Sequence, residues 1–180
     1  FAVVQLTQPL IEMLKYSKGR VVIVSSVDGI VSLPGNAPYD ASKFAVEAYA
    51  DALRVELSLW NVHVAVVNPS TMKTPLAMGF FEAHKKTWEL MDERDPNGSW
   101  KKTFTRAWLD EYVSVNTKNL ASMAQDPVHA IRDVVHAVVA RNPRLRYLSG
   151  TLAKTLFFAL WKMPELLPPG TAWPRPWRPS

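Results

Sequence analysis

The chain has 180 residues, 48% of them hydrophobic and 21% charged, a balance typical of one globular domain or a large part of one. It has no cysteine, which excludes disulfides and thiolate metal sites, and its longest strongly apolar run, TLFFALW near residue 155, is shorter than the roughly 20 residues that cross a bilayer. The net charge of +5 is concentrated in residues 141–180, which hold seven basic residues and one acidic residue.

The first elements in chain order are a helix and a strand. Apolar residues recur at helical spacing over 3–16, which predicts a helix that ends before Gly19. RVVIVSS, residues 20–26, is β-branched without polar alternation, so it predicts a strand buried on both faces of a parallel sheet. Neither end has the features of a secretory signal. The chain starts without methionine, and we expect Phe1 to be a cut end.

A second strand follows a long helix. The sequence predicts a helix over 39–59, and HVAVVN, residues 63–68, predicts another buried strand. Strand, helix and strand form the βαβ unit of a doubly wound sheet, so the predicted fold class is α/β with a Rossmann-like parallel sheet. Ligands bind such sheets beyond the carboxyl ends of the strands. Ser25 and Ser26 lie at the carboxyl end of the first predicted strand, and residues 68–70 lie at the carboxyl end of the second.

The remaining residues predict an insertion, further α/β elements and a tail. Residues 76–125 read as two helices broken at DPNGS, and long irregular segments of this kind often cover a binding site. A helix over 126–141, a strand near residue 147 and a last helix complete a domain portion over 1–163. Residues 164–180 hold six of the 14 prolines and predict an extended tail.

The basic tail also carries tryptophan, at Trp173 and Trp177. Basic residues interleaved with tryptophan suit a membrane surface, where amphipathic rings lie among the lipid headgroups. We expect no nucleic-acid partner, because no nucleic-acid-binding module accompanies the charge. A plain solvated tail is the remaining alternative.

Tyr39 and Lys43 lie one helical turn apart, and Ser26 ends the strand before them. A tyrosine hydroxyl has a pKa of about 10, which is too high for a base at neutral pH. An ammonium about 4 Å away would stabilise the phenolate by roughly 4 kcal/mol at an effective dielectric of ~20, which predicts a lowered pKa for Tyr39. The pair could then transfer a proton while Ser26 orients the substrate oxygen. A nicotinamide cofactor would have to take the hydride.

Three segments together resemble the short-chain dehydrogenase/reductase family. VVIVSSVDG, YDASK and NPSTMKT are similar to its catalytic serine strand, its Tyr-x-x-x-Lys pair and its Pro-Gly-x-x-x-Thr cofactor loop. The resemblance covers about residues 1–163 and implies that Ser26 polarises the substrate oxygen while Tyr39 exchanges its proton. The residues that it implies for binding NAD or NADP are Tyr39, Lys43, Pro69, Ser70, Met72 and Thr74. Lys43 would bind the nicotinamide ribose, and Thr74 with the backbone around Met72 would hold the carboxamide.

The chain departs from the family pattern in two ways. Ser70 stands where the family usually has glycine, and the glycine-rich phosphate loop and the ribose-reading residue are absent. The sequence therefore resembles the C-terminal part of such an enzyme and does not discriminate between NAD and NADP.

ARNPRLRYLSG, residues 140–150, and GRVV, residues 19–22, are similar to the retinol, hydroxysteroid and 3-hydroxybutyrate dehydrogenase branch. That resemblance implies a lipophilic alcohol, ketone or aldehyde of the retinoid or steroid class as substrate, and a homodimer. It also implies membrane association, with the endoplasmic reticulum as the expected compartment and mitochondrion or cytoplasm as alternatives. The alternative function is a catalytically inactive membrane-surface binding or scaffolding protein of the same fold.

Other polar residues give weaker signals. The four histidines lack metal-ligand spacing, so no metal site is predicted. Asp28 lies two residues after Ser26 and could touch a substrate, but an ordinary loop acid is the favoured interpretation.

Overall fold

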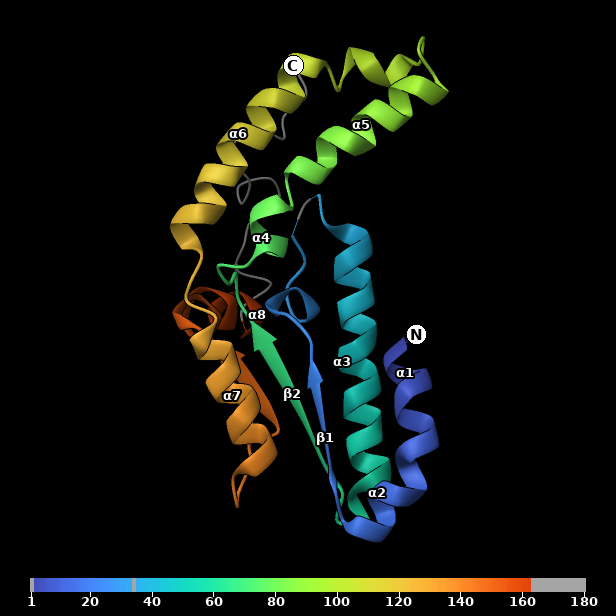
Figure 1. Ribbon diagram of the computed structural model, residues 1–180, viewed down its shortest axis with the longest axis vertical. Coiled ribbons are helices and arrows are strands. Elements are labelled where there is room, and N and C mark those ends of the chain that lie inside the picture. Colours follow the sequence, from blue (N-terminus) through green and yellow to red (C-terminus); the bar gives the residue numbers. More distant parts are fainter. Residues whose placement is uncertain (1, 34, 163–180) are drawn as a thin grey trace. The chain divides into compact units, whose positions relative to one another are not determined.

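A computed structural model of the chain describes residues 2–33 and 35–162 (Figure 1). The described residues form two compact units. Unit 1 lies within residues 1–70 and 127–164, and unit 2 spans Thr71–Asp126, which contains the insertion expected over 76–125. The tail expected over 164–180, with its proposed membrane contact, lies outside the described residues.

Unit 1 is built on a parallel three-stranded sheet in the order β1-β2-β3. β1 spans Arg20–Val24, β2 spans His63–Pro69 and β3 spans Arg146–Ser149. The helix α3, Ala37–Ser58, connects β1 to β2, and α7, Val128–Val139, leads toward β3 (Figure 1). The predicted α/β class with a parallel sheet is therefore confirmed.

The two faces of β2 support separate apolar cores. Val64 and Val66 pack with Leu53 and Leu57 of α3, whereas Ala65 and Val67 lie in a second core that includes Ala137 of α7. The four β2 residues, Val64, Ala65, Val66 and Val67, have no exposed surface. Because helices cover both faces of the strand, it carries apolar residues at consecutive positions instead of alternating with polar ones.

The helix expected over 3–16 is interrupted. α1 spans Ala2–Thr7, a 3₁₀ turn follows at Gln8–Leu10, and α2 spans Ile11–Ser17. The interruption coincides with Pro9, which has no N–H to donate and whose ring clashes with the carbonyl one turn earlier. Lys18, with φ of 49°, ends α2 in the left-handed conformation.

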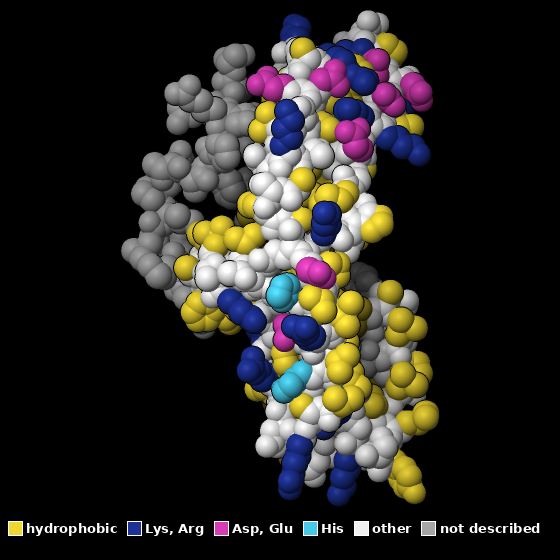
Figure 2. All heavy atoms as spheres, turned by 60° about the vertical axis from the view of Figure 1, so that its left-hand side comes forward, with side chains coloured by type: hydrophobic (Ala, Val, Ile, Leu, Met, Phe, Trp, Pro, Cys, Tyr) yellow, Lys and Arg dark blue, Asp and Glu magenta, His cyan; other side chains and the backbone are white. Residues whose placement is uncertain are grey.

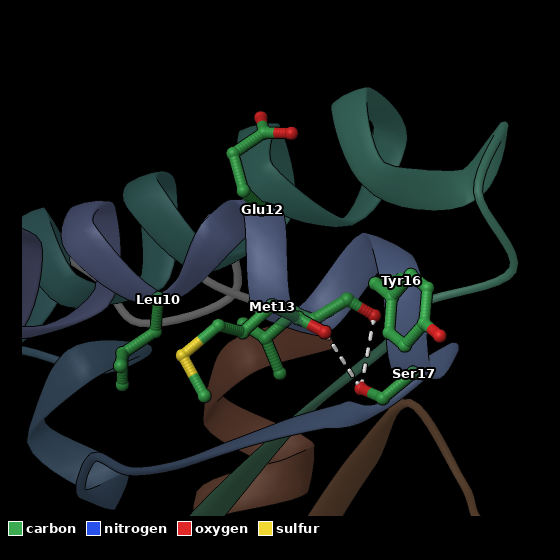
Figure 3. A pocket seen from close by; sticks show the side chains of 6 residues that line it. Leu10, Glu12, Met13, Tyr16 and Ser17 are labelled. Carbon is green, nitrogen blue, oxygen red and sulfur yellow. Dashed lines mark hydrogen bonds between the residues drawn. The ribbon is translucent and has the colours of Figure 1, made fainter.

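The outward side of α1 and α2 is apolar and open. Leu6, Met13 and Tyr16 are 72%, 68% and 94% exposed. A hollow of about 550 Å³ lies here and is lined by Leu10, Glu12, Met13, Leu14, Tyr16 and Ser17. Figure 3 shows Leu10 and Met13 on one side of the helix and Glu12 on the other. None of these residues belongs to the predicted site.

Unit 2 is helical. It contains α4, Pro75–Gly79, α5, Glu82–Arg94, the 3₁₀ turn η3, Ser99–Lys102, and α6, Arg106–Met123. α6 contributes the buried residues of a small core, against which aromatic rings pack. The residues of this core are Leu109, Tyr112 and Val113, flanked by Phe81, Trp88 and Trp108. Figure 2 shows charges of both signs mixed with apolar side chains over α5 and α6.

The last described elements cover the end of β1. β3 is followed by η4, a π-helical turn over Ala153–Phe157, and α8, Phe158–Lys162. Ala153 and Phe157 pack on Val27 of the 3₁₀ turn η2, Val27–Gly29, directly after Ser26. Over the part of the chain that the structure describes, no helix has both the length and the apolar character that crossing a membrane demands.

Candidate active site

Ser26 lies at the carboxyl edge of the sheet, in the turn that follows β1. The Ser25 N–H still donates to the Val67 carbonyl at 2.8 Å, so strand pairing extends to the residue before Ser26. The Ser26 hydroxyl then caps η2 by accepting a hydrogen bond of 3.1 Å from the Asp28 N–H. Strand pairing and this cap together fix the buried hydroxyl at the predicted edge.

Gly29 brings this turn against α3. A Cβ atom at Gly29 would lie 2.8 Å from Ser25 Oγ and 3.1 Å from the Lys43 carbonyl oxygen, and both distances are too short for a carbon atom without displacement. Glycine therefore permits the close approach of η2 to the Lys43 turn of α3. A close approach between segments distant in the sequence leaves no local pattern, so no signal in the sequence indicated this role of Gly29.

Tyr39 and Lys43 lie in the first turns of α3, which begins at Ala37 with Pro38 in its first turn. The Lys43 Nζ lies 5.5 Å from the centroid of the Tyr39 ring. It donates to the carbonyls of Val24 and Ser25 at 3.4 and 3.3 Å. The Ser26 hydroxyl interacts with the phenol by a hydrogen bond that lowers the pKa of Tyr39. The structure thus brings Ser26, Tyr39 and Lys43 to one edge of the sheet.

The net shift of the Tyr39 pKa is upward, so the predicted lowering is wrong for this structure. Burial of the phenol raises its pKa most, the hydrogen bond from Ser26 opposes that rise, and the charges of Asp28 and Asp40 add to it. Burial also lowers the pKa of Lys43, whose ammonium is bound to strand carbonyls. The Lys43 ammonium thus lies at the carboxyl end of β1. Its charge does not outweigh the burial and the two carboxylates that raise the pKa of Tyr39.

Asp28 is a third ionisable group at this edge. Burial and the neighbouring charge of Asp40 raise its pKa to about 6, against the opposing effects of the Ser26 hydrogen bond and the Lys43 charge. Asn36 Nδ2 donates to Asp28 at 3.3 Å and to Asp40 at 2.8 Å. The favoured interpretation of Asp28 as an ordinary loop acid therefore missed its electrostatic coupling to Lys43 and Tyr39.

The predicted cofactor residues after β2 fall in both units. Pro69 ends β2, and the Ser70 hydroxyl donates to the Ser149 carbonyl at 3.2 Å within unit 1. Met72 and Thr74 belong to unit 2, where Met72 is bridged to Gln125 and Thr74 Oγ1 caps α4. Met72 and Thr74 thus make their contacts within unit 2. That they bind the same cofactor as Tyr39 and Lys43 stays a prediction.

The donors on α3 fit a nicotinamide cofactor. An ammonium has three N–H groups, and the two hydrogen bonds of Lys43 to the strand carbonyls are long. Lys43 therefore has donor capacity for a ribose hydroxyl. Tyr39 is 40% exposed, which leaves part of this residue open to a ligand.

The sequence is similar to a known protein family and to several of its members. Residues 1–85 match the family described as short chain dehydrogenase. Short-chain dehydrogenase/reductase family 9C member 7 of Mus musculus is 34% identical over 169 residues, 89% of this chain and 50% of that protein. Retinol dehydrogenase 16 of Homo sapiens is 35% identical over 166 residues, 92% of this chain and 51% of that protein. 17-beta-hydroxysteroid dehydrogenase type 6 of Rattus norvegicus is 31% identical over 165 residues, 91% of this chain and 50% of that protein.

A crystal structure supports the fold. A short chain dehydrogenase from Burkholderia cenocepacia, solved in complex with NADP, has a TM-score of 0.51 and 20% identity, covering 82% of this chain and 44% of that one. The chain spans about half the length of the curated relatives that it matches. These findings confirm the resemblance to the short-chain dehydrogenase/reductase family that the serine strand, the Tyr-x-x-x-Lys pair and the following loop predicted.

Proposed function

We propose that the whole protein transfers a hydride between NAD(H) or NADP(H) and a lipophilic alcohol, ketone or aldehyde of the retinoid or steroid class. The observation that carries this proposal is the convergence of Ser26, Tyr39 and Lys43 at the carboxyl edge of the sheet. The substrate class is supported by relatives named retinol dehydrogenase 16 and 17-beta-hydroxysteroid dehydrogenase type 6.

In this proposal each residue has a distinct task. Tyr39 takes the proton of the substrate hydroxyl during oxidation and returns it to the carbonyl oxygen during reduction. Ser26 donates a hydrogen bond to the same oxygen, and Lys43 holds the nicotinamide ribose. The nicotinamide, when bound, supplies or accepts the hydride. Pro69, Ser70, Met72 and Thr74 are proposed to complete the cofactor site.

The alternative is a membrane-surface binding or scaffolding protein that has kept the fold and lost catalysis. It rests on the excess of basic residues over 141–180 together with the tryptophans of that segment. Membrane association, with the endoplasmic reticulum as the expected compartment, likewise stays a prediction. Turnover by the whole protein separates the two functions.

We expect Ser26→Ala to lower turnover by about 100-fold, because the substrate oxygen loses a hydrogen-bond donor where charge develops. The whole protein would be incubated with NAD⁺ or NADP⁺ and retinol or a hydroxysteroid, and reduced cofactor would be followed by absorbance. Ser58→Ala, at an exposed hydroxyl at the far end of α3, is the matched control and should leave turnover unchanged. Absence of turnover in the unmodified protein would favour the alternative, and full turnover in Ser26→Ala would remove Ser26 from the mechanism.

We also propose a homodimer formed through the exposed apolar side of α1 and α2. α3 adds exposed small residues at Ala41, Ala45, Ala48 and Ala52, which would allow close helix packing. Met13→Glu places a charge on this side and should convert a dimer to a monomer in sedimentation velocity at equal concentration. Leu76→Glu, at an 84% exposed site on α4, is the control and should keep the dimer. A monomeric unmodified protein, or a Met13→Glu variant that stays dimeric, contradicts the proposal.

A further inference from the structure

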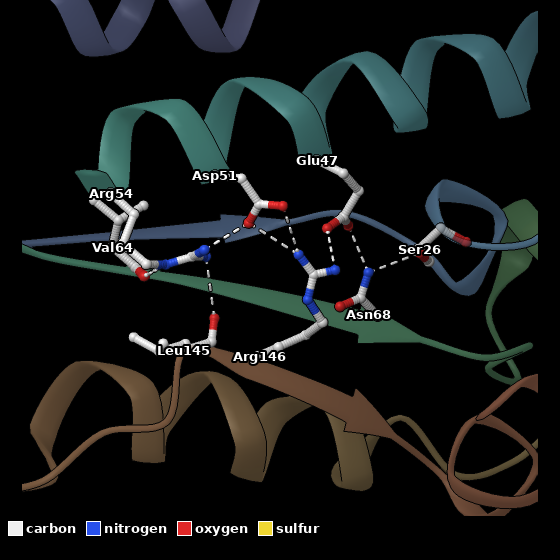
Figure 4. A network of polar contacts seen from close by, with 8 residues as sticks. All are labelled: Ser26, Glu47, Asp51, Arg54, Val64, Asn68, Leu145 and Arg146. Carbon is white, nitrogen blue, oxygen red and sulfur yellow. Dashed lines mark hydrogen bonds and ion pairs between the residues drawn. The ribbon is translucent and has the colours of Figure 1, made fainter. Parts of the chain in front are cut away.

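A polar network, buried at Asn68 and Glu47 and exposed at Asp51, extends from Ser26 along the sheet (Figure 4). It contains Glu47, Asp51 and Arg54 from α3, Asn68 from β2 and Arg146 from β3. At one end, its contacts reach the main-chain carbonyl of Ser26. The network therefore joins three elements of unit 1 to the turn that carries the candidate catalytic serine.

Asn68 makes the connection to Ser26. This side chain has no exposed surface, and its Nδ2 donates to the Ser26 carbonyl at 2.9 Å and to Glu47 Oε1 at 2.6 Å. Both partners are acceptors, so the NH₂ group of the amide must face them. The side chain thereby ties the end of β1 to α3 across β2.

Glu47 and Lys43 lie on the same face of α3. Glu47 lies one helical turn after Lys43, is 6% exposed, and its second carboxylate oxygen pairs with Arg146 at 2.8 Å. Burial lowers the pKa of Lys43, and the charge of Glu47 is the strongest of the opposing influences, followed by Asp28 of η2. Glu47 thus favours the charged ammonium from the helix side, and Asp28 does so from the turn.

Packing and hydrogen bonding at position 47 do not require a negative charge. A neutral glutamine could accept the hydrogen bond from Asn68 equally well, whereas a buried carboxylate carries a desolvation cost of several kcal/mol. Arg146 offsets that cost, and Arg146 is held in turn by Asp51 at 3.1 and 3.3 Å. This carboxylate lies one helical turn from Lys43, where its charge acts on the Lys43 ammonium.

We propose that Glu47 and Asn68 are positioning residues of the active site: Asn68 fixes the strand end that carries Ser26, and Glu47 anchors Asn68 and supplies a negative charge one helical turn from Lys43. This inference rests on the proposed function for its catalytic consequence. The charge relation between Glu47 and Lys43 does not depend on that function.

The charge relation is tested by the reactivity of Lys43 as a function of pH. Trace acetic anhydride labels only uncharged amines, and mass spectrometry of the whole protein after digestion reports the midpoint for Lys43. Glu47→Gln keeps the acceptor for Asn68 and removes the charge, so the midpoint should move to lower pH. Asp51→Asn removes a carboxylate one turn further from Lys43 and should leave the midpoint unchanged. An unshifted midpoint in Glu47→Gln overturns the role of the charge.

A double variant tests the same charge relation in case Glu47→Gln alone fails to fold. The double variant Glu47→Gln with Arg146→Leu leaves neither partner of the buried ion pair as an unpaired charge. The Lys43 midpoint should move to lower pH there as well. If it stays at the value of the unmodified protein, the role of the charge is likewise overturned.

The positional role is tested separately with Asn68→Ala. This variant leaves the Ser26 carbonyl without its side-chain donor but keeps Glu47, so turnover should fall by about 10-fold or more while the Lys43 midpoint stays unchanged. Full turnover would overturn the positional role. If the unmodified protein has no turnover but the midpoint shift in Glu47→Gln is present, the proposed function fails and the Glu47–Lys43 relation stands.

Discussion

Tyr39→Phe in the whole protein is expected to lower turnover by between about 10²- and 10⁴-fold while cofactor affinity changes little. The substitution removes only the phenol oxygen, which carries the transferred proton in the proposed mechanism. The ring remains, and with it the contact to the Lys43 ammonium, 5.5 Å from the ring centroid. A loss confined to turnover would therefore identify the hydroxyl as the group that acts in the transition state.

The pH profile gives this prediction a second readout. Burial and the charges of Asp28 and Asp40 raise the pKa of Tyr39 in the structure, so the phenol is protonated at neutral pH. Oxidation of an alcohol needs the phenolate as base and should speed up as the pH rises, whereas reduction needs the phenol as acid and should slow in the alkaline range. Tyr39→Phe should lack both dependences.

Two measurements on the same variant decide the outcome. Turnover is followed by absorbance of the reduced cofactor, and cofactor affinity by quenching of protein fluorescence. Tyr16→Phe, at a 94% exposed position on α2, is the control and should behave like the unmodified protein. Unchanged turnover in Tyr39→Phe would exclude Tyr39 as the acid and base, and loss of cofactor binding alone would assign it a binding role.

The sheet of unit 1 could be predicted because its causes are local. The β-branched runs at 20–26 and 63–68 lack polar alternation, and the structure buries β2 on both faces as that pattern requires. The same expectation is wrong for β1, which lies at the edge of the described sheet and has Val24 52% exposed. The break at Pro9 was also present in the sequence, since proline cannot continue a regular helix from its interior. The prediction gave the apolar spacing more weight than this one residue.

The site was predictable in its positions but not in its electrostatics. A residue after a buried strand must lie at the carboxyl edge of the sheet, and residues four apart on a helix share a face, so Ser26, Tyr39 and Lys43 could be placed together. The direction of the Tyr39 pKa depends on burial and on Asp28 and Asp40, which the turn through Gly29 brings close. Such packing between distant segments has no signature in local spacing.

Arg146→Leu is expected to lower the free energy of unfolding by about 3–5 kcal/mol, because it leaves the buried carboxylate of Glu47 without its cation. Leucine retains much of the apolar volume of the arginine stem, so the cost comes chiefly from the unpaired charge. The second pairing of Arg146, with the half-exposed Asp51, contributes little by comparison. Urea unfolding of the whole protein, followed by circular dichroism, measures the difference.

A double variant separates charge from packing in this prediction. Glu47→Gln added to Arg146→Leu removes the unpaired carboxylate and keeps an acceptor for Asn68, so most of the lost stability should return. Lys15→Leu breaks an exposed ion pair with Glu12 and should cost at most about 1 kcal/mol. If Arg146→Leu costs no more than Lys15→Leu, Glu47 does not depend on Arg146. If the double variant is as unstable as Arg146→Leu alone, the loss arises from packing, since removing the unpaired charge would then have recovered nothing.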